Sequence, residues 1–175
     1  MPGLIVDVGS LVGRPGTTRD IVSTERVEGL AGVLGWVGED EPVRLDLVAE
    51  SVLEGVEVTG SISGRMHLRC SRCLRDYDEP FRQRVEEIFY VGAPADEEDG
   101  YRVVGDTIDL EPMVRDVVVL GIPVTPVHTR DCRGLCPVCG ADLNVTDCGH
   151  RSEPADLRWA PLTSLGGLLG STEEE

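Results

Sequence analysis

Four residues in the last third of the chain have the types and the spacing of metal ligands. Cys136 and Cys139 form a C-x-x-C turn, and Cys148 and His150 follow it closely. Zinc is held tetrahedrally by thiolates and imidazoles, and a C-x-x-C turn presents two thiolates from one tight loop. Gly140, directly after the turn, can take the positive φ that closes it. These residues therefore predict a compact zinc site of the Cys3His type.

The remaining cysteines permit a second site. Cys70 and Cys73 form another C-x-x-C pair, and Cys132 follows His128 by four residues. In a two-site partition one zinc ion is bound by Cys136, Cys139, Cys148 and His150, and the other by Cys70, Cys73, His128 and Cys132. A rival partition joins the two C-x-x-C pairs into one zinc-ribbon-like site and leaves the other ligands outside it. The sequence leaves the choice between one and two zinc ions open.

A structural role for this zinc is favoured over a catalytic one. Structural sites fill all four positions with protein ligands, whereas catalytic sites keep one position for water. Protein ligands are plentiful, and the sequence has no H-E-x-x-H motif, no phosphate-binding glycine loop and no set of nucleophile and base. We therefore expect no enzyme activity. The alternative from another class is a thiol redox sensor or oxidoreductase that uses Cys70 and Cys73, although redox C-x-x-C pairs usually begin a helix.

Length and composition indicate a globular cytoplasmic protein. The chain has 175 residues, of which 41% are hydrophobic and 27% charged, so it can bury a core without covalent staples. Its longest apolar run, near Val117 to Leu120, is far too short to span a membrane. The first residues lack the basic start of a secretory signal. In the reducing cytoplasm clustered cysteines are expected to bind metal rather than form disulfides.

The charge distribution bears on possible partners. The net charge is -16, and all 16 basic residues are arginines. An acidic surface repels phosphates and favours basic proteins. Six arginines nevertheless crowd around the first C-x-x-C pair and could bind RNA phosphates or an acidic partner: Arg65, Arg69, Arg72, Arg75, Arg82 and Arg84. The charged outer face of an ordinary antiparallel sheet would look similar. A zinc-ribbon module that binds RNA directly is a further alternative.

Alternation of apolar and polar residues predicts the elements that position these side chains. Between Gly55 and Cys70 the even positions are mostly apolar and the odd ones polar, which predicts a long half-buried strand. The alternation resumes in a return strand that ends near Val91, so the first C-x-x-C pair lies at a hairpin turn. His67 falls on the polar face and is expected to be exposed. Gly60 falls on the apolar face, which indicates a bend or a close approach of another element.

Shorter elements are predicted on both sides of the hairpin. Strands are expected at residues 4–8 and 43–48 and as a pair within 101–110, and the rest of the first forty residues is expected to be mostly irregular. A helix is predicted over 110–120, because Asp109 can cap it and Gly121 can end it. The β-branched run at 117–119 leaves a buried strand as the competing interpretation.

Together these elements predict a β-rich α+β fold with an antiparallel sheet, a long hairpin, one main helix and a zinc-stabilised C-terminal segment. Three parts are expected: a β-rich domain over residues 1–128, a cysteine-rich zinc segment over 129–155 packed on it, and a short segment with an acidic tail over 156–175.

Four stretches together resemble the YceD family of large ribosomal RNA subunit accumulation proteins. They are "CSRCL" at the predicted hairpin turn, "GDTIDLEPMVRDVVVLGIPVTPVH", "DCRGLCPVCGADLN" and "DLRWAPLTSL", and the resemblance covers roughly residues 10–169. It implies a non-enzymatic cytoplasmic protein that is needed for large-subunit ribosomal RNA to accumulate and acts in ribosome assembly. The implied partner is a ribosomal RNA precursor or a large-subunit ribosomal protein, with no membrane and no small-molecule substrate.

The family's cysteine blocks match this chain by position at Cys70, Cys73, Cys132, Cys136, Cys139 and Cys148. His150 departs from the pattern, since many relatives have cysteine there, and some relatives lack part or all of the cluster. Zinc would then stabilise this branch of the family without being its shared functional element. The acidic residues around Asp96 to Asp99 and at the C-terminus could hold a basic ribosomal protein before assembly.

Overall fold

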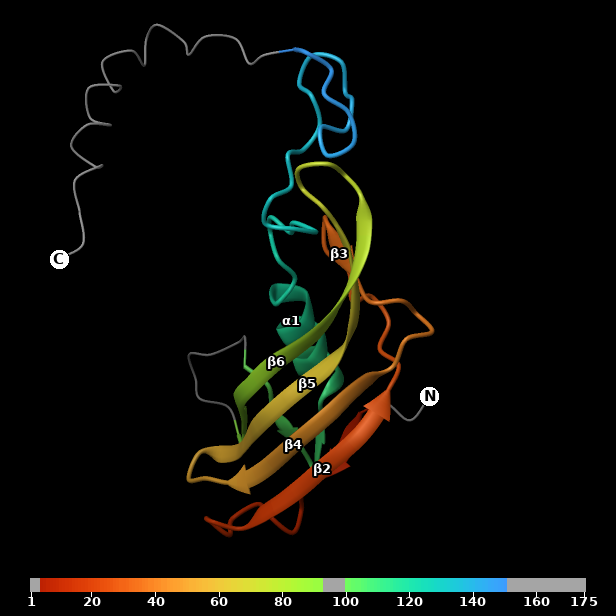
Figure 1. Ribbon diagram of the computed structural model, residues 1–175. Coiled ribbons are helices and arrows are strands. Elements are labelled where there is room, and N and C mark those ends of the chain that lie inside the picture. The colour runs from red at the N-terminus through yellow and green to blue at the C-terminus, as the bar shows by residue number, and fades with distance from the viewer. Residues whose placement is uncertain (1–3, 93–99, 151–175) are drawn as a thin grey trace, which may run out of the picture. The chain divides into compact units, whose positions relative to one another are not determined.

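A computed structural model of the protein describes residues 4–92 and 100–150. The chain divides into two compact units, Met1–Cys132 and Arg133–Glu175. Among the described residues, every helix and strand belongs to the first unit (Figure 1). The predicted short segment with its acidic tail at 156–175 and most of the acidic loop at 93–100 lie outside the described residues.

A five-stranded antiparallel sheet forms the body of the first unit. Its strands are β2 (Thr18–Glu25), β3 (Gly35–Trp36), β4 (Val43–Ser51), β5 (Gly55–Arg69) and β6 (Asp76–Tyr90). β5 is central, because it pairs with β6 along its whole length, with β4 over one half and with β3 near its end. Past the end of the β4 pairing, β5 and β6 continue as a hairpin whose turn contains Cys70 and Cys73 (Figure 1).

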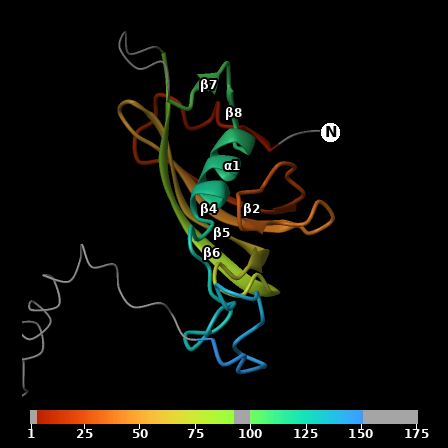
Figure 2. The same ribbon diagram turned by 90° about the horizontal axis from the view of Figure 1, so that it is seen from above.

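A smaller sheet and one helix complete the first unit. The strands β1 (Ile5–Asp7), β7 (Val103–Val104) and β8 (Thr107–Asp109) pair in the order β1-β8-β7. Helix α1 (Glu111–Leu120) follows and lies against one face of the main sheet, as Figure 2 shows. The carboxylate of Asp109 accepts a hydrogen bond from the backbone N–H of Glu111 at 3.0 Å, which satisfies one of the free donors of the first turn.

The core lies between α1 and the inner face of the main sheet. Leu45 and Leu47 of β4, Ile62 of β5 and Phe89 of β6 are buried there together with Met113 of the helix. Successive residues of a strand point to opposite faces, so the alternation in the sequence becomes the division between this inner face and a polar outer face.

Most of the predicted elements are confirmed. The hairpin, the strands near residues 4–8 and 43–48, the short pair across Gly105 and the helix are all present. The competing interpretation of residues 117–119 as a buried strand is wrong, because the apolar residues of this region are spaced for one helical face.

The expectation of mostly irregular structure in the first forty residues did not include the strand β2. β2 pairs with β4 from Thr18 to Glu25. It is an edge strand in which Ile21 alone is buried, so its hydrophobic alternation is too weak to reveal it in the sequence.

Gly60 allows β4 and β5 to approach each other closely, as its place on the apolar face predicted. Its φ is +140°, and a Cβ atom at this position would lie 2.3 Å from the carbonyl oxygen of Asp46 and 2.8 Å from the Cα of Leu47. Both neighbours are backbone atoms of the sheet, so they cannot move aside without disturbing the strand pairing.

We expect Gly60→Ala to lower the free energy of unfolding by at least about 2 kcal/mol, because it combines backbone strain with a clash. Gly13→Ala is the matched control, since Gly13 has a φ of +76° but nothing within 4 Å of its added Cβ. Strain alone should cost about 1 kcal/mol there. Chemical denaturation of both variants measures the difference, and equal losses would contradict the close approach.

Candidate metal centres

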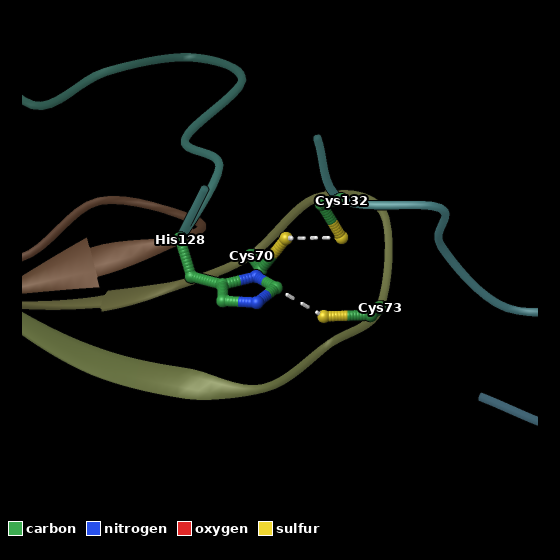
Figure 3. A group of neighbouring side chains, drawn as sticks. All are labelled: Cys70, Cys73, His128 and Cys132. Atoms are coloured by element: carbon green, nitrogen blue, oxygen red, sulfur yellow. Dashed lines mark hydrogen bonds between the residues drawn. The ribbon is translucent and has the colours of Figure 1, made fainter. Parts of the chain in front are cut away.

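The first cluster joins the hairpin turn to the segment that follows α1. Cys70 and Cys73 come from the turn between β5 and β6, and His128 and Cys132 come from the later segment (Figure 3). The backbone N–H of Ser71 donates to the carbonyl of Pro126 at 2.8 Å. The hairpin turn and the later segment are therefore attached to each other directly beside the four ligands.

The distances in the first cluster fit a single tetrahedral ion. The Sγ atoms of Cys70 and Cys132 are 3.8 Å apart, and Sγ of Cys73 is 3.5 Å from Nδ1 of His128 (Figure 3). Zinc bonds of about 2.3 Å to sulfur and about 2.0 Å to nitrogen require separations of about 3.8 Å and about 3.5 Å for these pairs. All the ligand atoms lie within 4.8 Å of one another. The donor set therefore fits a closed Cys3His zinc site.

Hydrogen bonding gives one thiol of this cluster the protonation state that zinc needs. Burial alone raises the pKa of the Cys70 thiol, but hydrogen bonds from His128 and from the backbone N–H groups of Cys73 and Arg72 lower that pKa to about 5. Burial raises the pKa of Cys73. The site thus favours a thiolate at Cys70, and the thiolate is the form of cysteine that binds metal.

The two C-x-x-C turns have the same backbone geometry. The N–H of Leu74 donates to the carbonyl of Cys70 at 2.9 Å, and the N–H of Gly140 donates to that of Cys136 at 2.8 Å. The φ angles are +59° at Leu74 and +73° at Gly140, so the positive φ predicted for Gly140 is confirmed. A leucine adopts this conformation at a cost of about 1–2 kcal/mol, which the contacts around the hairpin turn must offset.

The second cluster lies entirely within the second unit. Cys136, Cys139, Cys148 and His150 place their ligand atoms within 4.8 Å of one another. The backbone N–H groups of Cys139 and Val138 lower the pKa of the Cys136 thiol to about 6. Cys139 and His150 are exposed, in contrast to the buried thiols of the first cluster. The eight predicted ligands are therefore grouped as in the two-site partition.

Residues 133–150 are held by the four ligands and by turn hydrogen bonds, such as those from the N–H of Leu143 to the carbonyl of Gly134 and from the N–H of Arg133 to Asn144, with almost no apolar core. This stretch has no helix or strand, and Cys136 is its one buried hydrophobic side chain. Its cysteines are free thiols. Small segments without a core depend on a disulfide or a metal ion for stability. A metal ion bound at the second cluster is therefore the best candidate for the group that stabilises residues 133–150.

The six predicted contact arginines do not form one group. Arg69 donates to the Asp76 carboxylate at 2.7 and 3.2 Å. Arg72 donates to the carbonyls of Cys132 at 3.0 Å and Arg130 at 3.4 Å, so it supports the first cluster. Arg75 also interacts with another group of the protein. The other three, Arg65, Arg82 and Arg84, are exposed residues of β5 and β6.

His67 is half-buried and bound at both ring nitrogens, so the expectation of an exposed histidine is wrong. Its Nδ1 is 2.7 Å from Asp78 Oδ1, and its Nε2 is 3.0 Å from Glu41 Oε2. The ring stacks on Trp36 with centroids 5.5 Å apart. The hydrogen bond with Asp78 is the main reason that the pKa of His67 is raised above 6.5. Sequence alternation could place His67 on its face but not reveal partners from other elements.

The fold and these two clusters define a small strand-rich protein with candidate structural metal centres. Residues 58–166 match the family described as "Large ribosomal RNA subunit accumulation protein YceD", and this span includes every ligand of both clusters. The chain belongs to the YceD family. Membership implies a role in the accumulation of large ribosomal subunit RNA. None of the helices in the described residues is long and apolar enough to cross a membrane.

Relatives in other organisms are similar over most of the chain. An uncharacterized protein of Mycobacterium tuberculosis is 38% identical over 179 residues, which cover 97% of this chain and 84% of that protein. An uncharacterized protein of Bacillus subtilis, YlbN, is 33% identical over 71% of this chain and 74% of its own length. The chloroplastic "Large ribosomal RNA subunit accumulation protein YCED homolog 1" of Arabidopsis thaliana is 38% identical over 33% of this chain and 18% of its own. No solved structure matches the chain.

The raised pKa of His67 predicts a pH-dependent contribution to stability. A group whose pKa is higher in the folded state stabilises the fold below its unfolded pKa of about 6.5, and this stabilisation is lost as the pH rises through the folded value. We therefore expect wild-type protein to lose more unfolding free energy than Asp78→Asn does as the pH rises above 6.5. Glu79→Gln is the control on the same strand and should follow the wild type. Identical pH profiles for Asp78→Asn and wild type would contradict this account.

Two independent sites predict a specific metal stoichiometry. Protein purified without chelator should contain two zinc ions per chain, and Cys70→Ser and Cys136→Ser should each remove one, because each loses a ligand of a different cluster. Mass spectrometry of the native protein measures this. Loss of the same single ion in both variants would favour the zinc-ribbon partition instead.

Proposed function

We propose that this protein is a non-catalytic accessory factor for large-subunit ribosomal RNA accumulation and ribosome assembly, stabilised by two structural zinc ions. It acts in the cytoplasm on a ribosomal RNA precursor or a large-subunit ribosomal protein. The observation that carries the proposal is the family match over residues 58–166. A plant relative bears the same description of its role.

The ligand sets support a structural role for the metal. Each cluster supplies four protein donors. Four donors occupy every coordination position of a tetrahedral ion and leave none for a reacting water. The thiols of Cys70 and Cys132 are 62 residues apart in sequence. An ion bound by both thiols would close the long loop between them. In the unfolded chain this loop has considerable conformational entropy. Zinc would therefore stabilise the attachment of the later segment to the hairpin turn.

The thiol redox alternative has less support than structural zinc. Cys70 and Cys73 are 0% and 7% exposed, whereas redox-active thiols are accessible. They also lie in a hairpin turn instead of at the start of a helix. Thiol alkylation distinguishes the two functions: a zinc-bound set resists the reagent until a chelator is added, while a redox pair reacts at once.

The proposed function predicts a defect in ribosomal RNA. Depletion of this protein from its host should lower the ratio of large-subunit to small-subunit ribosomal RNA, and expression of the wild-type chain should restore it. Quantitative RNA electrophoresis measures the ratio. Cys70→Ser should restore it only in part, since loss of one site destabilises the fold. An unchanged ratio after depletion would contradict the proposed function.

A further inference from the structure

The outer face of the main sheet carries four arginines close together, although the chain as a whole is acidic. β5 and β6 present Arg65, Arg82 and Arg84 there, and β4 adds Arg44. All four are exposed. We refer to these four residues as the arginine patch. Arg44 was not among the arginines predicted from the sequence, because it lies far from the hairpin turn along the chain.

Strand register places the patch in the middle of the outer face. Arg44 is opposite Ser63, which is opposite Arg82, so the three stand in one row across β4, β5 and β6. Neighbouring strands are about 4.8 Å apart and residues two apart in a strand about 7 Å, so the patch spans about 10 Å across the strands. Its side chains thus form a compact array on a rigid sheet.

The arginines keep most of their charge available to a ligand. Arg65 and Arg82 have no ion pair or hydrogen bond among the described residues. Arg44 is 3.8 Å from the Asp46 carboxylate, and Arg84 is 3.0 Å from that of Glu86, with exposed side chains in both pairs. Exposed ion pairs of this kind contribute little and exchange readily with another anion. Four cations against two carboxylates leave a local excess of positive charge.

The surface between the arginines suits phosphate better than protein. Ser61 and Ser63 lie between β4 and β6 in the register. A shallow hollow of about 650 Å³ is lined by Asp46, Thr59, Gly60, Ser61, Arg82 and Arg84. Arginine together with serine and threonine hydroxyls is the usual donor set for nucleic-acid phosphates. A protein interface would instead be expected to centre on exposed aromatic or aliphatic side chains, which this hollow lacks.

The same composition selects one kind of RNA. Single-stranded RNA is bound by stacking its bases on aromatic side chains, and the hollow and the arginine patch contain none. Double-helical RNA presents phosphates and 2′-hydroxyls to a flat polar surface. We propose that the arginine patch of Arg44, Arg65, Arg82 and Arg84 binds the phosphate backbone of double-helical RNA. This assignment rests on the proposed function, which names ribosomal RNA as one possible partner. It adds the surface that would bind that RNA.

The test compares two charge-matched variants of the full chain. Arg82→Gln/Arg84→Gln removes two cations from the patch, whereas Arg14→Gln/Arg115→Gln removes two elsewhere, one in a loop and one on α1. Binding to an RNA hairpin duplex and to a uridine homopolymer is measured by fluorescence anisotropy over a range of salt concentrations. Thermal unfolding of each variant checks that the fold is intact.

We expect the patch variant to bind the duplex at least about tenfold more weakly than wild type and to show a shallower salt dependence. Each lost phosphate contact should reduce the slope of log affinity against log salt by about 0.9, so two contacts reduce it by about 1.8. The control variant should bind as wild type does. Equal binding by both variants, tighter binding of the homopolymer than of the duplex, or no salt-dependent binding by wild type would each overturn the assignment.

Failure of this assignment is distinguishable from failure of the proposed function. In depleted cells the patch variant should restore the ratio of large-subunit to small-subunit ribosomal RNA less well than the control variant does. If depletion lowers the ratio but both variants restore it equally, the protein acts through another surface and the patch assignment is wrong. If depletion leaves the ratio unchanged, the proposed function itself is wrong whatever the patch binds.

Discussion

The pairing of β5 with β6 is the constraint on which the rest of this unit depends. The two strands pair in register from Gly55 with Tyr90 to Arg69 with Asp76, and a shift of one residue would turn every side chain to the other face. The register thus determines at once which residues form the core, where the first C-x-x-C turn lies and which arginines share the outer face. β4 adds to this ladder, and Gly60 permits the close approach that their pairing requires.

The two clusters have similar ligands but different surroundings. The first is anchored on a hairpin that a core already supports, and its thiols are buried. The second holds a stretch with almost no buried apolar surface, so its ligands must supply most of its stability. A metal ion would therefore add to an existing structure at the first cluster and create the structure at the second. The exposure of Cys139 and His150 also leaves the second cluster more open to chelators and oxidants.

The two faces of the main sheet have separate tasks. The inner face packs on α1 and provides stability through apolar burial. The outer face contributes nothing to that core, so its composition is free to serve binding. Its middle carries the arginine patch, in which Arg44 and Arg84 lie beside Asp46 and Glu86. Toward the hairpin turn the acidic residues Asp76 and Asp78 are engaged by Arg69 and His67. A chain with a net charge of -16 can thus present a local cationic surface to a polyanion.

The sequence by itself determined the elements whose signals are local. The alternation from Gly55 to Cys70 and again to Val91 predicted the long hairpin, and the capping residues around α1 predicted the helix, because strand and helix periods are properties of neighbouring residues. The sequence also predicted the eight candidate ligands from their types and spacing, and it predicted the positive φ at Gly140. Tertiary structure decided the rest. Edge strand β2 is held by its pairing with β4 and not by its own pattern. The grouping of His128 and Cys132 with Cys70, the partners of His67 and the row formed by Arg44 and Arg82 all depend on strand register and on contacts between distant segments, which a linear pattern does not contain.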